Sequence, residues 1–154
     1  MYYQLNRFRD CEQAYLAAIA NQPQDVQVAN NLAYLYTNDL KEPKKGLEFA
    51  EKASRMAPND AKILDTYGWT LANLNSLAEA EQALVRAVQL ESPLTVSRYH
   101  LGWVYEQRNN LEEAKKQYQQ GLEMIKDKSD ETLYGDLKKA LERVGQKLER
   151  GSGR

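Results

Sequence analysis

The side chains most often used for catalysis and metal binding are scarce in this chain of 154 residues, which has one histidine and one cysteine. His100 belongs to no cluster of histidine, cysteine or carboxylate at ligand spacing, and the sequence has no glycine-rich phosphate loop or nucleophile elbow. Asp65 could instead reach Tyr99 or His100 on a neighbouring helix and orient a surface. Cys11 cannot form an internal disulfide and is predicted to be a small core residue. We therefore expect no enzyme, no cofactor and no metal site.

Binding chemistry is better represented, because large aromatic side chains recur at a nearly constant interval. Tyr34, Trp69 and Trp103 are thirty-five and thirty-four residues apart, and amide or carboxylate side chains stand near each. Rigid aromatic rings anchor a partner, while amides and carboxylates hydrogen-bond its backbone. The predicted partner-binding residues are Asn30, Tyr34, Asn38, Asp65, Trp69, Asn73, Tyr99, Trp103 and Glu106. A structural alternative stays open, in which both tryptophans pack against adjacent helices.

A repeated unit must position these residues, since many others recur in step with them. Ala53, Ala87 and Gly121 are thirty-four residues apart, and Gly68-Trp69 returns as Gly102-Trp103. The upstream copy fits the same pattern with one inserted residue. A fixed period of this length is typical of stacked supersecondary units that bury their apolar faces only against their neighbours.

Within each copy, apolar residues recur every three or four positions, which predicts a pair of amphipathic helices. Asp25 and Asp60 are predicted to begin first helices, the earlier of which should end near Thr37. Ser76 with Glu79 forms a capping-box pattern before a second helix. The predicted single domain covers residues 1–150, with a flexible tail at 151–154. Its parts are a half repeat at 1–23, repeats at 26–58, 61–93 and 95–126, and a capping helix at 129–150.

The spacing of Leu101, Gly102, Tyr105, Ala114 and Tyr118 matches the signature of the tetratricopeptide repeat, and the chain resembles this family, bacterial members above all, over residues 2–126. The resemblance implies an all-α fold: a right-handed solenoid of stacked antiparallel helix pairs with a C-terminal capping helix. It also implies a concave groove, lined by the first helix of each pair. In this family such a groove binds a peptide or a helix of another protein.

Departures from the family pattern restrict the kind of groove. Arg98 replaces the large aromatic residue usual near the start of a copy, so we expect it to snorkel to the surface or to pair with a neighbour. Family members that clamp a C-terminal carboxylate line the groove with Lys, Arg and Asn. Because Lys62 and Arg98 are the nearby cations here, and Tyr34, Asp65 and other residues occupy the clamp positions, a carboxylate clamp is disfavoured.

Composition excludes other classes of partner. The chain has 21 basic and 22 acidic residues and a net charge of -1, so it lacks the basic field of a nucleic-acid-binding protein. No apolar stretch is long enough to span a bilayer or to serve as a signal peptide. We expect a soluble protein without membrane insertion, and the cytoplasm and the periplasm both remain open.

Two further functions remain alternatives to peptide binding. The half repeat would leave Tyr2, Phe8, Tyr15 and Ile19 without a covering helix pair, and such an end could stack on a second copy of the chain as a homo-oligomer. Alternatively, the repeats could be a recruitment module of a larger bacterial envelope or polysaccharide-export protein.

Overall fold

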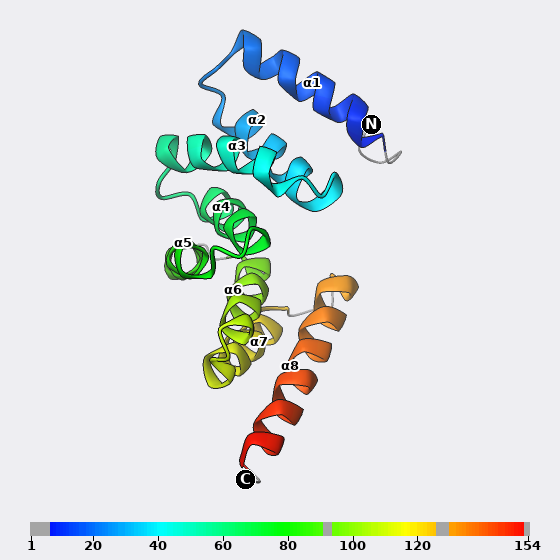
Figure 1. The fold of residues 1–154 in the computed structure, drawn as a ribbon, viewed down its shortest axis with the longest axis vertical. Helices are drawn as coiled ribbons and strands as arrows, with labels where there is room; N and C mark the ends of the chain where they lie inside the picture. Colours follow the sequence, from blue (N-terminus) through cyan, green and yellow to red (C-terminus); the bar gives the residue numbers. More distant parts are fainter. Residues whose placement is uncertain (1–6, 91–93, 126–129, 153–154) are drawn as a thin grey trace.

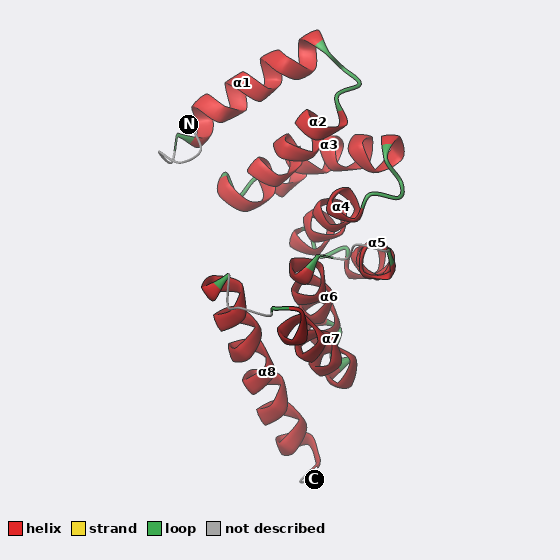
Figure 2. Ribbon diagram, turned by 180° about the vertical axis from the view of Figure 1, so that it is seen from behind, coloured by secondary structure: helices red, strands yellow, loops and turns green. Residues whose placement is uncertain are grey.

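The computed structural model describes residues 7–90, 94–125 and 130–152, which form helices joined by short turns (Figure 2). The helices are α1 (Phe8–Asn21), α2 (Val26–Tyr34), η2 (Leu35–Asp39), α3 (Pro43–Met56), α4 (Ala61–Asn73), α5 (Leu77–Gln89), α6 (Thr95–Gln107), α7 (Leu111–Met124) and α8 (Glu131–Ser152). Figure 1 shows them stacked along the long axis of the molecule, with α1 at one end and α7 and α8 at the other. None of these helices is both long and apolar enough to cross a membrane.

From α2 to α7 the helices form consecutive pairs, and each pair packs against the next pair along the chain. The pairs are α2 with α3, α4 with α5, and α6 with α7, while α3 also contacts α4, and α5 also contacts α6. The first helices touch one another directly, α2 with α4 and α4 with α6. At the end of the series, α8 packs against both α7 and α6, where the first helix of a further pair would lie. This arrangement confirms the predicted all-α solenoid and its capping helix.

Glycine residues, which have no side chain, let the two helices of a pair approach closely. A Cβ atom on Gly68 would lie 2.7 Å from Cγ of Leu84 on the paired helix. A Cβ atom on Gly102 would lie 2.5 Å from Cε1 of Tyr118, whose side chain is fully buried. Real Cβ atoms do not tolerate such distances, so glycine at these positions sets the spacing between the paired helices.

The start signals predicted at two aspartates hold for the first helices α2 and α4, and the one predicted for the second helix α5 fails. Asp25 accepts a hydrogen bond from the backbone N–H of Val28, and Asp60 accepts one from that of Lys62. The capping box predicted at Ser76 is wrong, because the Ser76 side chain makes no capping hydrogen bond. Its ψ of 64° is far from the extended ψ of 101° and 118° at Asp25 and Asp60, and we infer that this turns the hydroxyl away from the helix end.

The turn inside each pair uses a left-handed residue at a fixed place in the repeat. Lys41, Asn75 and Asn109 have φ values of 57°, 62° and 59°, and they are thirty-four residues apart. Asparagine adopts this conformation more easily than most residues, which accounts for two of the three positions.

The residue inserted in the upstream copy forms a short π-helix, η2. Ala33 and Gly68 are thirty-five residues apart, whereas Gly46 and Ala80 are thirty-four apart, so the insertion lies between Ala33 and Gly46. η2 follows α2 directly within that interval, and a π-turn accommodates one extra residue without breaking the helix. The first helix of this pair therefore continues beyond Thr37, where it was expected to end.

The C-terminal boundary also differs from the prediction. α8 includes Gly151 and Ser152, which were expected in the flexible tail, and its sequence contains no proline to end it earlier. The predicted start of the capping helix at Ser129, the closing residues Pro93 and Lys126, and the tail residues 153–154 lie outside the described residues.

Candidate functional site

The first helices α2, α4 and α6 present side chains from equivalent repeat positions on one side of the stack. On this surface Asn38, in η2, accepts a hydrogen bond of 3.0 Å from the indole N–H of Trp69 on α4. The Trp69 ring stacks on the imidazole of His100 on α6, with centroids 4.1 Å apart and planes within 10°. Three successive first helices are thus joined by one line of polar and aromatic contacts.

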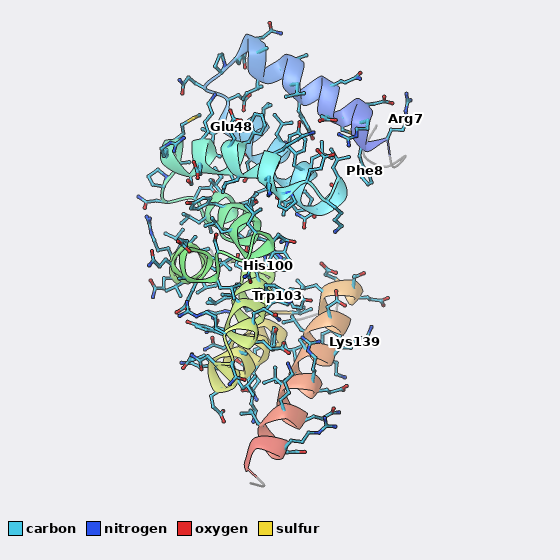
Figure 3. The ribbon with its side chains drawn as sticks, in the orientation of Figure 1. Arg7, Phe8, Glu48, His100, Trp103 and Lys139 are labelled. Atoms are coloured by element: carbon cyan, nitrogen blue, oxygen red, sulfur yellow. The ribbon has the colours of Figure 1, made fainter. Side chains whose placement is uncertain are left out.

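A second aromatic ring and a carboxylate complete the contacts of His100. Trp103 lies edge-on to Trp69 at 5.3 Å, one turn along α6 from His100, in the middle of the molecule (Figure 3). Asp65 Oδ1 lies 2.9 Å from Nδ1 of His100, which confirms the predicted contact between α4 and α6. Both side chains are about nine-tenths buried. The histidine is held between a carboxylate and an indole, an arrangement that fixes its position.

The side of the stack formed by α2, α4 and α6 is called the inner surface below. It is more open at α2 than at α4 and α6. Tyr34 is 46% exposed and, with Leu16 on α1, is one of the two exposed large apolar side chains among the described residues. Asn30 lies one turn earlier on the same helix and is 1% exposed. Asn73, at the far end of α4, is exposed and donates a hydrogen bond to the backbone carbonyl of Trp69.

Two of the predicted residues on α6, Glu106 and Tyr99, lie against the capping helix or within the cluster that it closes. Glu106 accepts hydrogen bonds from Arg143 and Lys147 on α8 at 2.7 to 2.8 Å, and from the buried hydroxyl of Tyr118 at 3.2 Å. Its side chain is 2% exposed. Tyr99 packs its ring against Tyr118, with centroids 6.0 Å apart, within the cluster that α6 and α7 form with α8. Glu106 is therefore enclosed within the fold and does not face an open groove.

The environment of Glu106 determines its charge. Burial alone would raise its pKa, but the hydrogen bonds from Arg143 and Lys147 outweigh burial and lower the pKa to about 2. Burial and the neighbouring Glu106 charge raise the pKa of Tyr118, so the hydroxyl remains a donor. The ionised carboxylate fastens α8 to α6.

The other groups identified from the sequence are also accounted for. Arg98 hydrogen-bonds to Gln117 and Gln120 on α7, which confirms that it pairs with neighbours. Cys11 is buried and free, as expected of a core residue. In the described part of the chain, no group of three histidine, cysteine, aspartate or glutamate side chains is placed to hold a metal ion.

Residues beside those predicted contribute to the inner surface. His100 is not among the predicted partner-binding residues, although Asn31, Thr66 and His100 occupy equivalent places in the three repeats, one residue after the predicted Asn30, Asp65 and Tyr99. This shared position in the repeat is the sequence feature that could have placed His100 on the inner surface. Tyr15 of α1 and Lys62 of α4 line an open pocket with Asn30, Asn31 and Tyr34.

The apolar side chains of α1 are covered to a greater extent than predicted. Ile19 packs against the cluster of Ala29, Ala53 and Ile63, which contradicts the expectation that it lacks a cover. Phe8 is half-buried, and Tyr15 lines the pocket beside α2. Tyr2 lies outside the described residues.

Comparison with known proteins identifies the family of the repeat that contains α6 and α7. The family model of the tetratricopeptide repeat matches residues 96–128, which include α7 and all of α6 except its first residue. This segment is a tetratricopeptide repeat, and the earlier repeats of the chain are similar to it. Repeats of this family generally mediate interactions between proteins.

One curated relative and several solved structures share the repeat. The peroxisomal targeting signal receptor of Saccharomyces cerevisiae is 36% identical over 90 residues, which cover 51% of this chain and 14% of the receptor. The chain therefore spans only a small part of that relative. Crystalline MamA aligns over 99% of this chain and 95% of its own, with a TM-score of 0.72 and 18% identity.

Two further structures align over most of this chain. A thermophilic tetratricopeptide protein of Thermus thermophilus has a TM-score of 0.74 and 22% identity, covering 91% of this chain and 76% of that one. The first tetratricopeptide domain of Spaghetti (RPAP3), bound to an HSP90 peptide, has a TM-score of 0.70 and 21% identity, covering 82% and 94%. At these identities the structural similarity establishes the fold.

Proposed function

We propose that this chain is an interaction module that binds a segment of another protein along the inner surface of α2, α4 and α6. The observation that carries the proposal is the set of aromatic side chains on these helices: Trp69, His100 and Trp103 form one fixed block, and Tyr34 on α2 is exposed. Aromatic side chains held in a fixed position bind a partner with little loss of conformational entropy. A structural neighbour with an HSP90 peptide bound supports the use of this fold for peptides.

The roles of the two tryptophans differ under this proposal. Trp69 is fixed by Asn38, His100 and Trp103, so it forms the wall of the surface. Trp103 and Tyr34 then supply contact area on either side of that wall. The two interpretations of the tryptophans, as packing residues and as partner contacts, are therefore compatible.

Self-assembly through α1 has weaker support. Leu16 is the exposed large aliphatic residue on that helix, at 37%, and single exposed leucines are normal on monomeric proteins. Ile19 already packs on α2 and α4 residues. We therefore favour binding of a peptide on the inner surface over stacking of two copies.

A selection experiment with an optical readout tests the proposal. Random twelve-residue peptides displayed on phage are selected on the chain, and synthetic versions of the survivors are titrated by intrinsic fluorescence. Both tryptophans of the chain lie on the inner surface, so bound peptide should change their emission. We expect Tyr34→Ala and Trp103→Ala to weaken binding about tenfold, the loss typical of an interface anchor.

The control is Gln89→Ala, a substitution of an exposed residue on the second helix α5. It should leave affinity unchanged. Circular dichroism should show the same helicity for all three variants. If selection yields no peptide, or if the peptides bind every variant equally, the inner surface is not the binding site.

A further inference from the structure

A second pocket lies at the edge of the stack, where the turns inside the first two full helix pairs meet. Its volume is about 610 Å³. One wall is formed by residues 41–45, which are the turn before α3 and the first turn of that helix, and the other by residues 73–75, at the end of α4. Asn73 is the lining residue that also belongs to the predicted partner-binding set, and neither tryptophan reaches this pocket.

The pocket is rich in cations that the fold leaves available. Lys41, Lys44 and Lys45 line it, and all three are exposed. Among the described residues, neither Lys41 nor Lys44 has an ion-pair partner. Lys45 pairs with Glu42 at 2.5 Å, and Glu42 also pairs with Arg9. Three lysines and one glutamate give the lining a net charge of +2, although the net charge of the whole chain is -1.

The other repeats show that the turn does not require a lysine at position 41. Lys41 has a φ of 57°, and Asn75 and Asn109 have values of 62° and 59° at the equivalent positions. Asparagine reaches this left-handed conformation more readily than lysine, because its short polar side chain can hydrogen-bond locally. Lysine at position 41 therefore has a conformational cost that the other two repeats avoid.

The same comparison applies to the two lysines in the first turn of α3. Lys44 corresponds to Glu112 of α7, and Lys45 corresponds to Glu79 of α5 and Glu113 of α7. Acidic side chains stabilise the first turn of a helix, where the backbone dipole is positive, and lysines destabilise it. α3 has no acidic residue in its first turn. Folding alone therefore does not account for this group of three lysines.

The rest of the lining indicates what an anion in this pocket should carry. Pro43 and Leu74 are half-buried and give the pocket apolar walls. The side-chain amide of Asn75 is exposed and has no partner among the described residues. The volume lies within the range of about 300 to 1,000 Å³ that is typical of sites for small organic ligands. The occupant should therefore combine negative charge with an apolar group.

We propose that this pocket binds a phosphate monoester, whose phosphate pairs with Lys41 and Lys44 and whose organic group packs against Leu74. A phosphate monoester carries about two negative charges near neutral pH, which match the net charge of the lining. Lysine binds phosphate as a point charge, and the Asn75 amide can donate a hydrogen bond to a further phosphate oxygen. The inference goes beyond the proposed function, because it assigns a different ligand to a different part of the surface.

A titration of the full chain with phenyl phosphate tests the proposal, followed by the amide NMR signals of the chain. We expect saturable shifts confined to residues 41–45 and 73–75. Phenyl sulfate has a similar shape with one negative charge, and inorganic phosphate has the charge without the ring. Each should bind at least about fivefold more weakly, through loss of one ion pair or of the apolar contact. Equal binding of the three anions would overturn the site.

Two substitutions install the residues of the third repeat and separate binding from folding. Lys41→Asn and Lys44→Glu should leave the melting temperature unchanged or raise it, because asparagine suits the turn and glutamate suits the helix start. Lys41→Asn should weaken phenyl phosphate about fivefold, and Lys44→Glu more than about tenfold, since attraction becomes repulsion. The control is Lys139→Asn, the same change of charge at an exposed residue of α8 (Figure 3), which should keep the affinity of the wild type.

The remaining outcomes decide between this pocket and simpler explanations. If Lys139→Asn weakens binding as much as Lys41→Asn, net charge alone attracts the anion and the pocket is not a site. If both pocket variants bind like the wild type, or if they lower the melting temperature, the proposal is wrong.

A phosphotyrosine flanked by glycines identifies the source of the ester. Tighter binding than phenyl phosphate assigns the pocket to a phosphorylated side chain, and equal or weaker binding assigns it to a free phosphate ester.

Discussion

At the scale of single residues, Glu106 makes the stability of the chain depend on pH. Its folded pKa of about 2 is below the ordinary value of about 4.3, so its contribution to stability is complete above the ordinary value. That contribution falls as pH drops from about 5 towards 2. Because Arg143 and Lys147 are half-exposed, we expect a loss on the order of 2 kcal/mol, measured by urea denaturation across this range.

The matched control for this prediction is Glu106→Gln. The amide cannot titrate, so the variant should be less stable near neutral pH and should lose less stability between pH 5 and pH 2 than the wild type. If wild type and variant have parallel profiles over that range, other carboxylates control the acid transition.

The residue types of the inner surface were predictable, but their partners were not. The repeat placed Asn38, Trp69 and Trp103 on one side of the stack, because equivalent repeat positions share a face. Periodicity does not reveal that the indole of Trp69 is hydrogen-bonded to Asn38, or that α8 closes over Glu106. Those contacts depend on side-chain reach between helices that are far apart in sequence.

At the scale of helices, the close approach within a pair makes specific predictions about glycine. A methyl group on Gly102 would collide with the ring of Tyr118, which is buried and hydrogen-bonded to Glu106. We expect Gly102→Ala to lower the free energy of unfolding by about 2 kcal/mol, since overpacking outweighs the helix propensity gained by alanine. Chemical denaturation measures this change.

Gly145 on α8 provides the opposite case. Apart from the adjacent backbone of α8 itself, no heavy atom lies within 4 Å of a Cβ added there, so Gly145→Ala should raise stability by about 0.5 to 1 kcal/mol. Equal effects of the two substitutions would show that helix propensity, and not contact with Tyr118, determines the response of this chain to alanine.

Helix boundaries show where pattern reasoning works and where it stops. Asp25 and Asp60 were found because an aspartate before an apolar repeat has a direct capping role. The inserted residue was also visible as a change from thirty-four to thirty-five in the spacing. Its form as a π-turn was not, because a sequence offset does not distinguish a longer loop from a widened helical turn.

At the scale of the whole molecule, the two ends of the inner surface differ in how they are completed. Near the C-terminus, α8 covers Tyr99 and Glu106 and supplies their partners. Near α2, Tyr34 is exposed and the Asn30 amide is unsatisfied. A partner segment would therefore gain most by docking at α2, and the block of Trp69, His100 and Trp103 would limit how far it continues towards α8.

The same series of neighbour contacts predicts how damage spreads through the chain. Leu137 on α8 is fully buried against Tyr118, and Leu137→Ala should cost about 2 to 5 kcal/mol locally. Because each helix pair contacts only its neighbours, amide hydrogen exchange should accelerate in α6, α7 and α8 and stay nearly unchanged in α1 to α3. Leu32→Ala, at a fully buried position of α2, should give the reverse pattern. A uniform acceleration in every helix, with either variant, would mean that the stack unfolds as one cooperative unit.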